Sequence, residues 1–501
     1  MSEPFYITTA ISYPNGKPHI GHAYEAIAAD AMARFQRSQG RDVRFQTGTD
    51  EHGLKMAQTA RAEGMEPKAF ADKMSNIFQQ MCDHLEVGYD RFIRTSTLAH
   101  HRASQAIWTA MEERGDLYLG RYEGWYSVRD EAYYEESELI QGEAGENLSP
   151  HGTPVEWTVE ESWFFRLSAY QQKLLDHYAA NPGFIQPESR RNEVLRFVEG
   201  GLKDLSVSRT SFDWGVKVPG HPDHVMYVWL DALTNYLTGL GYPDSGELWD
   251  RYWPADVHLI GKDVVRFHAV YWPAFLMSAG IALPKLVYGH GFLLSRGEKM
   301  SKSVGNVVDP IELADKFGVD ALRYFLLREV TFGQDGSYSA EAIVNRVNAE
   351  LVNSFGNLAQ RSLSMIFKNL GGVLPAAGGL PEDQAVLATV RQACTILASE
   401  FDRFAFSAGL EAWMGAVFAC NQYIDAAAPW TLKKTDPERM AAVLGTLVAA
   451  IRMLAEAVHP IIPASAEKLI ALIDSGKDGA PIAQPTPIFP RLELAEEEEA
   501  A

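Results

Sequence analysis

The chain has 501 residues, of which 47% are hydrophobic and 22% are charged, a composition typical of globular proteins. A chain of this length folds into about two to four domains and buries substantial apolar cores. The formal net charge of −20 excludes a broadly basic surface for nucleic-acid binding and leaves only a local basic patch for that purpose.

Three cysteines are present, Cys82, Cys394 and Cys420, and no two of them form a Cys-x-x-Cys pair. The sequence therefore supports neither a disulfide framework nor a zinc site made of thiolates. No apolar run reaches the roughly 18 residues that span a bilayer, and the first residues lack the basic and apolar regions of a signal peptide. We expect a cytoplasmic protein without membrane association.

The first motif is a turn between a predicted strand and a predicted helix. Residues 5–10 form an apolar run that predicts a buried strand, and residues 23–39 have the spacing of a helix. The Pro/Gly turn between them places His19 and His22 where the helix begins. Helix starts present N–H groups and partial positive charge that suit a phosphate, and imidazoles add further donors. The alternative is a histidine pair that merely caps the helix.

A second predicted strand, residues 44–47, leads into the polar turn 48–53 and then into another helix. Alternating strands and helices predict a parallel sheet with helices on both faces, and such sheets bind ligands beyond the carboxyl ends of their strands. Asp50 lies in that position. Its carboxylate either binds the ammonium group of a substrate or caps the following helix.

The pattern also indicates how the chain divides into domains. Strand and helix alternation covers residues 1–115 and resumes over residues 221–340, which predicts two halves of one nucleotide-binding domain. The aromatic, turn-rich residues 116–220 are typical of an insertion between these halves. Residues 341–480 have helical spacing, which predicts a helical bundle, and residues 481–501 form an acidic tail.

In the second half, residues 256–260 predict a strand that ends at Gly261 and Asp263. Val264 and His268 follow four residues apart, which places them on one face of the next helix. A single histidine on an apolar helix is more often a hydrogen-bonded core residue than a ligand contact, so both interpretations stay open here.

A cluster of lysine and serine occupies residues 299–303, with a glycine close to either end. Lys299, Ser301 and Lys302 offer ammonium and hydroxyl donors for phosphate oxygens. Alone, the cluster is typical of a solvated turn. Together with the histidine turn, and in this order, it matches the paired signatures of the class I aminoacyl-tRNA synthetases.

Over nearly its full length the sequence resembles the bacterial methionyl-tRNA synthetases. Further stretches carry the match, namely residues 8–16, 48–53, 227–232, 260–263, 357–361 and 428–430. The resemblance implies an α/β fold: a Rossmann-type parallel-sheet catalytic domain with an inserted connective domain, followed by an α-helical bundle that binds the anticodon. It also implies methionine–tRNA ligase activity, in which ATP and methionine give methionyl-adenylate and pyrophosphate before tRNA(Met) is charged for translation initiation and elongation.

The resemblance assigns site residues in groups. The catalytic residues that it implies are His19, His22, Lys299 and Lys302. The ATP-binding residues that it implies are His19, Gly21, His22, Gly261, Asp263, Lys299, Ser301 and Lys302. The methionine-binding residues that it implies are Ala10, Ile11, Tyr13, Asp50, Trp229, Ala232, Leu233, Tyr236, Val264 and His268. The anticodon-binding residues that it implies are Asn357, Arg361 and Trp430.

These assignments agree with elementary chemistry. A methionine thioether contacts aromatic edges favourably, and Trp229 and Tyr236 supply them, while Asp50 can pair with the ammonium group. Arg361 lies one helical turn after an asparagine, and Trp430 can stack on an unpaired base. Without the resemblance, a buried tryptophan and an ordinary surface pair would be the better interpretation.

Two features depart from many of these relatives. Where they carry a zinc knuckle in the inserted block, this chain has Ser127 and Asp130 for the first cysteine pair and Ser149 where the second begins. Serine and aspartate do not replace thiolates in a tight tetrahedral site, so we expect no zinc and no dedicated metal site, and Mg²⁺ only in complex with ATP. The chain is too short for the C-terminal dimerising domain of some relatives, so we expect a monomer.

Three alternatives stay open at this point. The first is a class I synthetase for leucine, isoleucine, valine or cysteine; the short insertion disfavours the first three and the missing thiolate zinc site disfavours the last. The second is a catalytically inactive RNA-binding paralogue, which His19, His22, Lys299 and Lys302 disfavour. The third is a small-molecule nucleotidyltransferase, which would not need a long helical bundle.

Overall fold

The structure of the protein is a computed structural model that describes residues 2–130, 132–142, 145–244, 246–295 and 307–494. The chain divides into two compact units. The first unit comprises residues 1–29 and 40–290, and the second comprises residues 30–39 and 291–501.

The first unit is built on a six-stranded sheet in which all neighbouring strands are parallel. In spatial order its strands are β3 (Arg91–Arg94), β2 (Asp42–Thr49), β1 (Pro4–Thr9), β14 (Val257–Gly261), β15 (Val287–His290) and β9 (Ile185–Gln186). Five of the six residues of β1 are buried, as expected of a central strand in a sheet with both faces covered.

The order of the strands changes direction between β1 and β14. From β1 the chain proceeds outward through β2 to β3, and it later returns to the other side of β1 as β14. Ile7 lies opposite both Phe45 of β2 and Val257 of β14, so the carboxyl ends of these three strands reach the same edge. Open parallel sheets bind ligands at such a switch point. This topology confirms the predicted Rossmann-type sheet.

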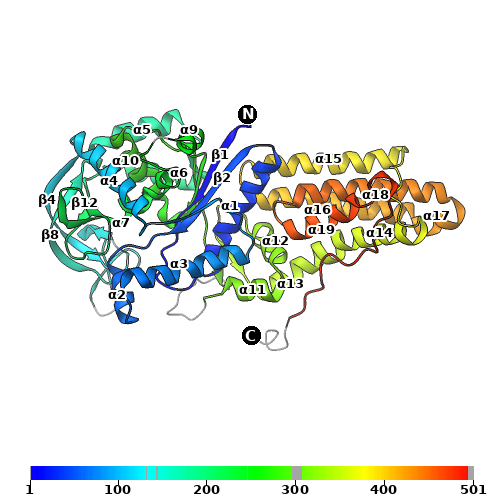
Figure 1. Ribbon diagram of the computed structural model, residues 1–501, viewed down its shortest axis with the longest axis horizontal. Helices are drawn as coiled ribbons and strands as arrows, with labels where there is room; N and C mark the ends of the chain where they lie inside the picture. Colours follow the sequence, from blue (N-terminus) through cyan, green and yellow to red (C-terminus); the bar gives the residue numbers. More distant parts are fainter. Residues whose placement is uncertain (1, 131, 143–144, 245, 296–306, 495–501) are drawn as a thin grey trace. The chain divides into compact units, whose positions relative to one another are not determined.

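Helices connect and cover these strands (Figure 1). Those that begin in the first unit are α1 (Ile20–Ser38), α2 (Leu54–Ala62), α3 (Pro67–His84), α4 (Leu98–Glu113), α5 (Gln171–Ala180), α6 (Glu188–Glu199), α7 (Val228–Leu233), α8 (Asn235–Thr238), α9 (Glu247–Tyr252) and α10 (Trp272–Ala279), with the short turns η1 (Glu136–Glu138), η2 (Leu167–Tyr170), η3 (Lys262–Val264) and η4 (Phe267–Tyr271). In α3, Phe70, Met74, Phe78 and Met81 recur every three or four residues and are buried, which explains why this segment forms an amphipathic helix.

Antiparallel strands dominate the segment that the sequence predicts as an insertion. They are β4 (Leu117–Ser127), β5 (Ala132–Tyr134), β6 (Ile140–Gln141), β7 (Asn147–Leu148), β8 (Glu156–Phe165), β10 (Leu205–Ser206), β11 (Ser208–Arg209), β12 (Lys217–Val218) and β13 (His221–Met226). β4 and β8 pair over ten residues, from Leu117 opposite Phe165 to Tyr126 opposite Glu156. The edge strand β9 also comes from residues 116–220, yet it pairs with β15 of the parallel sheet.

The residues at the positions of the relatives' zinc knuckle bind one another. The Asp130 carboxylate accepts hydrogen bonds from Ser149 Oγ (2.7 Å), Thr153 Oγ1 (2.6 Å) and the Tyr134 hydroxyl (3.0 Å). Ser127 Oγ lies 2.7 Å from Thr153 Oγ1. This donor set consists of hydroxyls and one carboxylate, which does not fit a structural zinc ion.

The second unit is mainly helical over its described residues. Its elements are β16 (Leu293–Ser295), α11 (Pro310–Phe317), α12 (Val319–Glu329), β17 (Gly336–Tyr338), α13 (Ala340–Arg346), η5 (Val347–Gly356), α14 (Asn357–Asn369), α15 (Pro381–Phe401), α16 (Phe406–Ala427), α17 (Pro429–Thr435), α18 (Pro437–Val458), α19 (Pro463–Asp474) and η6 (Lys477–Gly479). α15, α16 and α18 pack side by side, and α14 and α19 contact α18 (Figure 1, yellow to red). Trp413 is fully buried in this bundle, and its Nε1–H donates to the Leu454 carbonyl at 2.9 Å.

Among the described residues, α18 is the one helix that is long and apolar enough, by length and composition, to cross a membrane. Twelve of its residues are buried within the protein. The central helix of a bundle needs an apolar surface on most of its sides, so packing accounts for this composition.

A buried carboxylate joins three helices of the bundle. Asp383, at the start of α15, accepts hydrogen bonds at 2.7 Å from both terminal nitrogens of Arg439 on α18. The Tyr423 hydroxyl of α16 also donates to Asp383, and so does the Leu380 backbone N–H at 3.0 Å. The hydrogen bonds from Arg439 hold the pKa of the Asp383 carboxyl below its ordinary value of 3.8, against the effect of burial.

We predict that Arg439→Ala lowers the free energy of unfolding of the helical unit by about 3–5 kcal/mol, because it leaves the Asp383 charge buried without its cation. Urea titration followed by circular dichroism measures the effect, with Arg403→Ala as control. The Arg403 side chain is 66% exposed beside Glu400, so its loss should cost about 0–1 kcal/mol.

The pH dependence follows from the depressed pKa of Asp383. The pair stabilises the folded state fully above the ordinary carboxyl pKa of 3.8, and this contribution is lost as the pH falls below that value. The difference between Arg439→Ala and wild type should therefore shrink in acid. Equal effects of Arg439→Ala and Arg403→Ala at pH 7 would contradict this account of the bundle.

Candidate active site

The histidine turn lies between β1 and α1, at the carboxyl edge of the sheet. The rings of His19 and His22 approach each other with centroids 3.9 Å apart. The backbone N–H of His19 donates to His22 Nδ1, and that of Gly21 donates to His19 Nδ1, both at 3.1 Å. Because each Nδ1 accepts, the proton of each neutral ring is on Nε2, which makes Nε2–H a donor. A Cβ on Gly21 would lie 2.9 Å from the His19 ring, so any other residue here would displace that ring.

His22 is held in its neutral form. Burial lowers its pKa well below the ordinary value of 6.5, and the neighbouring His19 lowers it further. The edge of its ring also packs on Phe78 of α3, with centroids 5.0 Å apart. At neutral pH the His22 ring is therefore an uncharged donor on the wall of the site.

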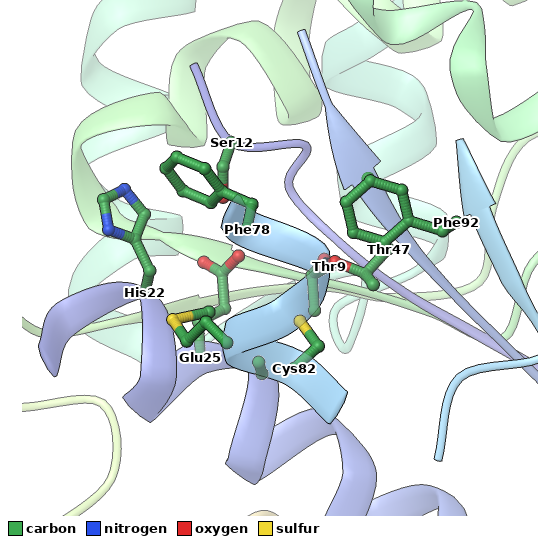
Figure 2. A pocket seen from close by; sticks show the side chains of 11 residues that line it. Thr9, Ser12, His22, Glu25, Thr47, Phe78, Cys82 and Phe92 are labelled. Carbon is green, nitrogen blue, oxygen red and sulfur yellow. Dashed lines mark hydrogen bonds between the residues drawn. The ribbon is translucent and has the colours of Figure 1, made fainter. Parts of the chain in front are cut away.

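A small cavity of about 10 Å³, open to solvent, lies beside His22 (Figure 2). It is lined by Thr9, Ser12, His22, Glu25, Ala26, Thr47, Gly48, Phe78, Met81, Cys82 and Phe92. These residues come from β1, α1, β2, α3 and β3 and the segment after β1, so the pocket opens where the parallel strands end. Figure 2 shows His22 and Glu25 coming from neighbouring turns of α1.

Glu25 is a site residue that the sequence analysis missed. Its Oε2 lies 2.8 Å from His290 Nε2, and the backbone N–H of Gly261 also donates to it. Burial raises the pKa of Glu25 above its ordinary value, opposed by His290, and the charge of Asp263 raises it further. Glu25 therefore lies beside Gly261 and Asp263, which the sequence analysis assigned to ATP. In the sequence, Glu25 follows His22 by three residues in the same predicted helix, and this spacing alone could have indicated that both side chains lie on one face.

The segment after β1 runs beside the end of β2. The backbone N–H of Ser12 donates to the Gly48 carbonyl, and that of Asp50 donates to the Ser12 carbonyl, both at 2.9 Å. Gly48 is required because a Cβ there would lie 2.1 Å from the Ile93 carbonyl oxygen. These bonds place Ile11, half-buried, and Asp50, buried, on adjoining segments.

Tyr13 is anchored to the next helix. Its hydroxyl accepts a hydrogen bond at 3.0 Å from the Met56 backbone N–H, in the first turn of α2. Its ring packs on an apolar cluster that includes Met56, Ala60 and Phe70. The structure therefore places Tyr13 against α2.

Aromatic side chains of α7, α8 and the segment after β14 pack on one another. Trp229 of α7 stacks on Phe267, with ring centroids 3.7 Å apart and planes 6° from parallel. The Tyr236 hydroxyl donates to His268 Nε2 at 2.6 Å, and His268 Nδ1–H donates to the Val264 carbonyl at 3.0 Å. Burial lowers the pKa of His268 to about 4, so this ring is neutral at pH 7.

Five of the ten residues assigned to methionine meet in one apolar cluster. Leu233 and Tyr236 belong to its buried core, and Ala10, Trp229 and Val264 pack against it. Ala232, also buried, precedes Leu233 on α7. His268 is both a hydrogen-bonded core residue and a neighbour of Trp229 and Tyr236, so the two interpretations of this histidine are compatible.

In the helical unit, two of the residues assigned to the anticodon meet. The Arg361 guanidinium lies over the Trp430 ring, with its Cζ 5.2 Å from the centroid, and pairs with Asp425 at 2.9 Å. Trp430 is 45% exposed, so it is not the buried core residue of the alternative interpretation. Asn357, exposed, begins α14 one turn before Arg361.

Lys299, Ser301 and Lys302 lie outside the described residues, so their place in the site stays a prediction. Within the described part of the chain, no group of three or more histidine, cysteine, aspartate or glutamate side chains is arranged to hold a metal ion.

Comparison with known proteins identifies the family. Residues 5–363 match the family model "tRNA synthetases class I (M)", and residues 374–487 match "Anticodon binding domain of methionyl tRNA ligase". Together the two models span nearly the whole described chain.

The similarity to individual proteins extends over nearly the whole of both aligned chains. The chain is 57% identical to a methionine–tRNA ligase of Brucella suis, over 99% of both chains, and 54% identical to one of Mycobacterium tuberculosis, over 98% of both. The structure of the M. tuberculosis methionyl-tRNA synthetase in complex with methionyl-adenylate aligns with a TM-score of 0.94, covering 98% of this chain and 100% of that one. The chain therefore belongs to the methionyl-tRNA synthetase family of class I aminoacyl-tRNA synthetases.

Proposed function

We propose that this enzyme activates methionine with ATP and then transfers the methionyl group to the 3′ end of tRNA(Met), in translation initiation and elongation. The observation that carries the proposal is the similarity over the full length to methionine–tRNA ligases, one of which has been solved with methionyl-adenylate. The helical domain matched to methionyl tRNA ligases supports tRNA as the acceptor.

Methionine enters the cluster that contains Trp229 and Tyr236. Its thioether contacts aromatic edges, which favour a polarizable sulfur, and the neutral His268 ring adds no charge that would have to be desolvated. Asp50 pairs with the substrate ammonium group. Ala10, Ile11, Tyr13, Ala232, Leu233 and Val264 complete the proposed pocket.

In the first step the methionine carboxylate attacks the α-phosphorus of ATP and pyrophosphate leaves. The carboxylate is already ionised at neutral pH, so the step needs positioning and charge stabilisation rather than a strong base. His19 and His22 donate to the phosphate oxygens, and their N–H···Nδ1 bonds support Nε2 as the donor. Lys302, assisted by Lys299, stabilises the pyrophosphate; Gly21, Gly261, Asp263 and Ser301 complete the proposed ATP site.

In the second step the 2′-hydroxyl of the terminal adenosine of tRNA attacks the activated carbonyl, and AMP leaves. Asn357, Arg361 and Trp430 read the anticodon. The exposure of Trp430 and the guanidinium over its ring support a stacking platform for an unpaired base.

The chain is organised in four parts and a tail. Residues 1–115 and 221–340 form the catalytic domain, residues 116–220 the connective domain, residues 341–480 the anticodon-binding domain and residues 481–501 the tail. The enzyme acts in the cytoplasm as a monomer and uses ATP with Mg²⁺. It holds no zinc, since the Asp130 carboxylate accepts hydrogen bonds from neighbouring hydroxyls at the knuckle positions.

The decisive test is ATP–pyrophosphate exchange measured with each amino acid in turn. Methionine should give the highest kcat/KM, because the proposed pocket is apolar, aromatic and uncharged apart from Asp50. Stronger exchange with leucine, isoleucine, valine or cysteine would contradict the assignment. Absence of exchange with every amino acid, together with retained tRNA binding, would favour an inactive RNA-binding protein.

We predict that Lys302→Ala lowers kcat for methionine-dependent exchange by roughly 100-fold or more and changes the KM for methionine little, because an ammonium group would act on the developing pyrophosphate charge. Lys477→Ala, an exposed lysine at the end of the helical unit, is the control and should keep wild-type exchange. Near wild-type turnover in Lys302→Ala would show that this lysine has another role.

We predict that Trp430→Ala lowers kcat/KM for tRNA(Met) charging by about 5- to 150-fold, since loss of one base stack costs roughly 1–3 kcal/mol. Pyrophosphate exchange without tRNA should stay unchanged. Ile396→Ala removes another exposed apolar side chain of the same unit and should leave charging intact. An equal loss of exchange and charging in Trp430→Ala would indicate unfolding rather than lost anticodon contact.

A further inference from the structure

A buried carboxylate behind the proposed methionine pocket has no role in the chemistry described so far. Asp231 is on α7, the helix that also carries Trp229, Ala232 and Leu233, and it is fully buried. A carboxylate in such a place costs free energy unless it is fully paired. The hydrogen-bond partners of the Asp231 carboxylate therefore indicate its role.

Each oxygen of Asp231 binds a different histidine. Oδ2 lies 2.6 Å from His52 Nδ1, and Oδ1 lies 2.7 Å from His100 Nε2. A carboxylate only accepts, so both ring nitrogens carry protons and donate to it. The second nitrogen of His100 lies 3.0 Å from Thr238 Oγ1, on α8. We refer to His52, Asp231 and His100 as the His–Asp–His clamp.

The clamp is buried on all sides. The exposed fractions of the three side chains are 3% or less. Burial alone would raise the pKa of Asp231, but its interactions with His52 and His100 hold it well below its ordinary value, so Asp231 stays ionised at neutral pH. Hydrogen bonds to an ionised acceptor are about twice as strong as neutral ones, and here water does not compete with them.

Through His52, the clamp reaches the turn that carries Asp50. This turn follows β2, and its middle residue is also fixed: the Glu51 carboxylate accepts from Arg94 Nε at 2.6 Å and from Thr49 Oγ1 at 2.9 Å. The Glu51 carbonyl accepts from Trp214 Nε1 at 2.6 Å. Asp50 is thus the residue between β2 and a two-residue anchor made by Glu51 and His52.

We propose that Asp231 is a positioning residue for methionine: acting through His52, it holds the Asp50 turn at a fixed distance from the α7 side chains, so that one substrate contacts both. Asp50 binds the ammonium group, and α7 contributes to the pocket for the side chain. This inference rests on the proposed function.

Four variants test the proposal in methionine-dependent pyrophosphate exchange. Asp231→Asn removes the shared acceptor charge, and His52→Ala removes the donor. His52→Asn keeps an N–H donor near the position of Nδ1. The matched control is Asp116→Asn, a partly buried carboxylate of the same unit that accepts from Ser278 Oγ at 2.6 Å and from the Tyr170 hydroxyl, neither of which is a clamp residue.

The variants that break the clamp should change the KM for methionine and leave the KM for ATP unchanged. In Asp231→Asn and His52→Ala the KM for methionine should rise roughly 10- to 100-fold, because misplacement by about 1 Å is enough for such losses, while the KM for ATP stays near wild type. His52→Asn should recover most of the methionine KM, and Asp116→Asn should keep both values. A merely structural role would lower the melting temperature and affect both substrates alike.

Three outcomes would overturn the proposal. Methionine KM in Asp231→Asn equal to that in Asp116→Asn, a parallel rise in the KM for ATP, or His52→Asn as impaired as His52→Ala would each do so. If Asp231→Asn does not fold, the comparison of the two His52 variants decides. Wild-type protein without methionine-dependent exchange would refute the proposed function itself, which distinguishes the two failures.

Discussion

Parallel pairing of β1 with both β2 and β14 is the constraint on which the site depends. Since the three strands run the same way and are in register near Ile7, the segments that follow them leave the sheet at one edge. The histidine turn, the Asp50 turn and Gly261 are those segments. A slip of one residue in any of these strands would turn its buried side chains to the opposite face and move the following turn out of place. The pairing of the buried residues of β1 with those of β2 and β14 therefore determines where the histidine turn, the Asp50 turn and Gly261 lie.

Around this edge, burial keeps several imidazoles neutral. His258 Nδ1–H donates to Thr8 Oγ1 at 2.7 Å, while its Nε2 accepts from Trp272 Nε1 at 3.3 Å, and burial keeps its pKa well below the ordinary value. The Tyr236 ring stacks on His258 at 4.0 Å and binds His268 through its hydroxyl. Such rings supply flat, polarizable surface without a charge to desolvate, which suits a thioether better than an ammonium or carboxylate side chain.

Local patterns allowed much of the fold and part of the site to be predicted. The strand, turn and helix at residues 5–39 and the helical spacing beyond residue 341 are properties of short segments, and they gave the correct fold class. β9 was not anticipated, because two residues of a parallel edge strand carry no periodic signal. Glu25 was missed since its contacts with His290 and Gly261 join segments more than 200 residues apart. The predicted lysine loop lies outside the described residues.

The His–Asp–His clamp also joins residues that are far apart in the sequence. Its proposed role concerns how the enzyme selects methionine over amino acids of similar size. An apolar pocket separates substrates that differ by one methylene by only roughly 10- to 200-fold. That limit assumes that the pocket keeps its size, and in the proposed pocket the size depends on the distance between α7 and the Asp50 turn. His52 and Asp231 are separated by 179 residues, yet they form the bond that spans this distance. Under the proposed role of the clamp, selectivity for side-chain length depends on the buried Asp231 carboxylate as well as on the aromatic residues Trp229 and Tyr236.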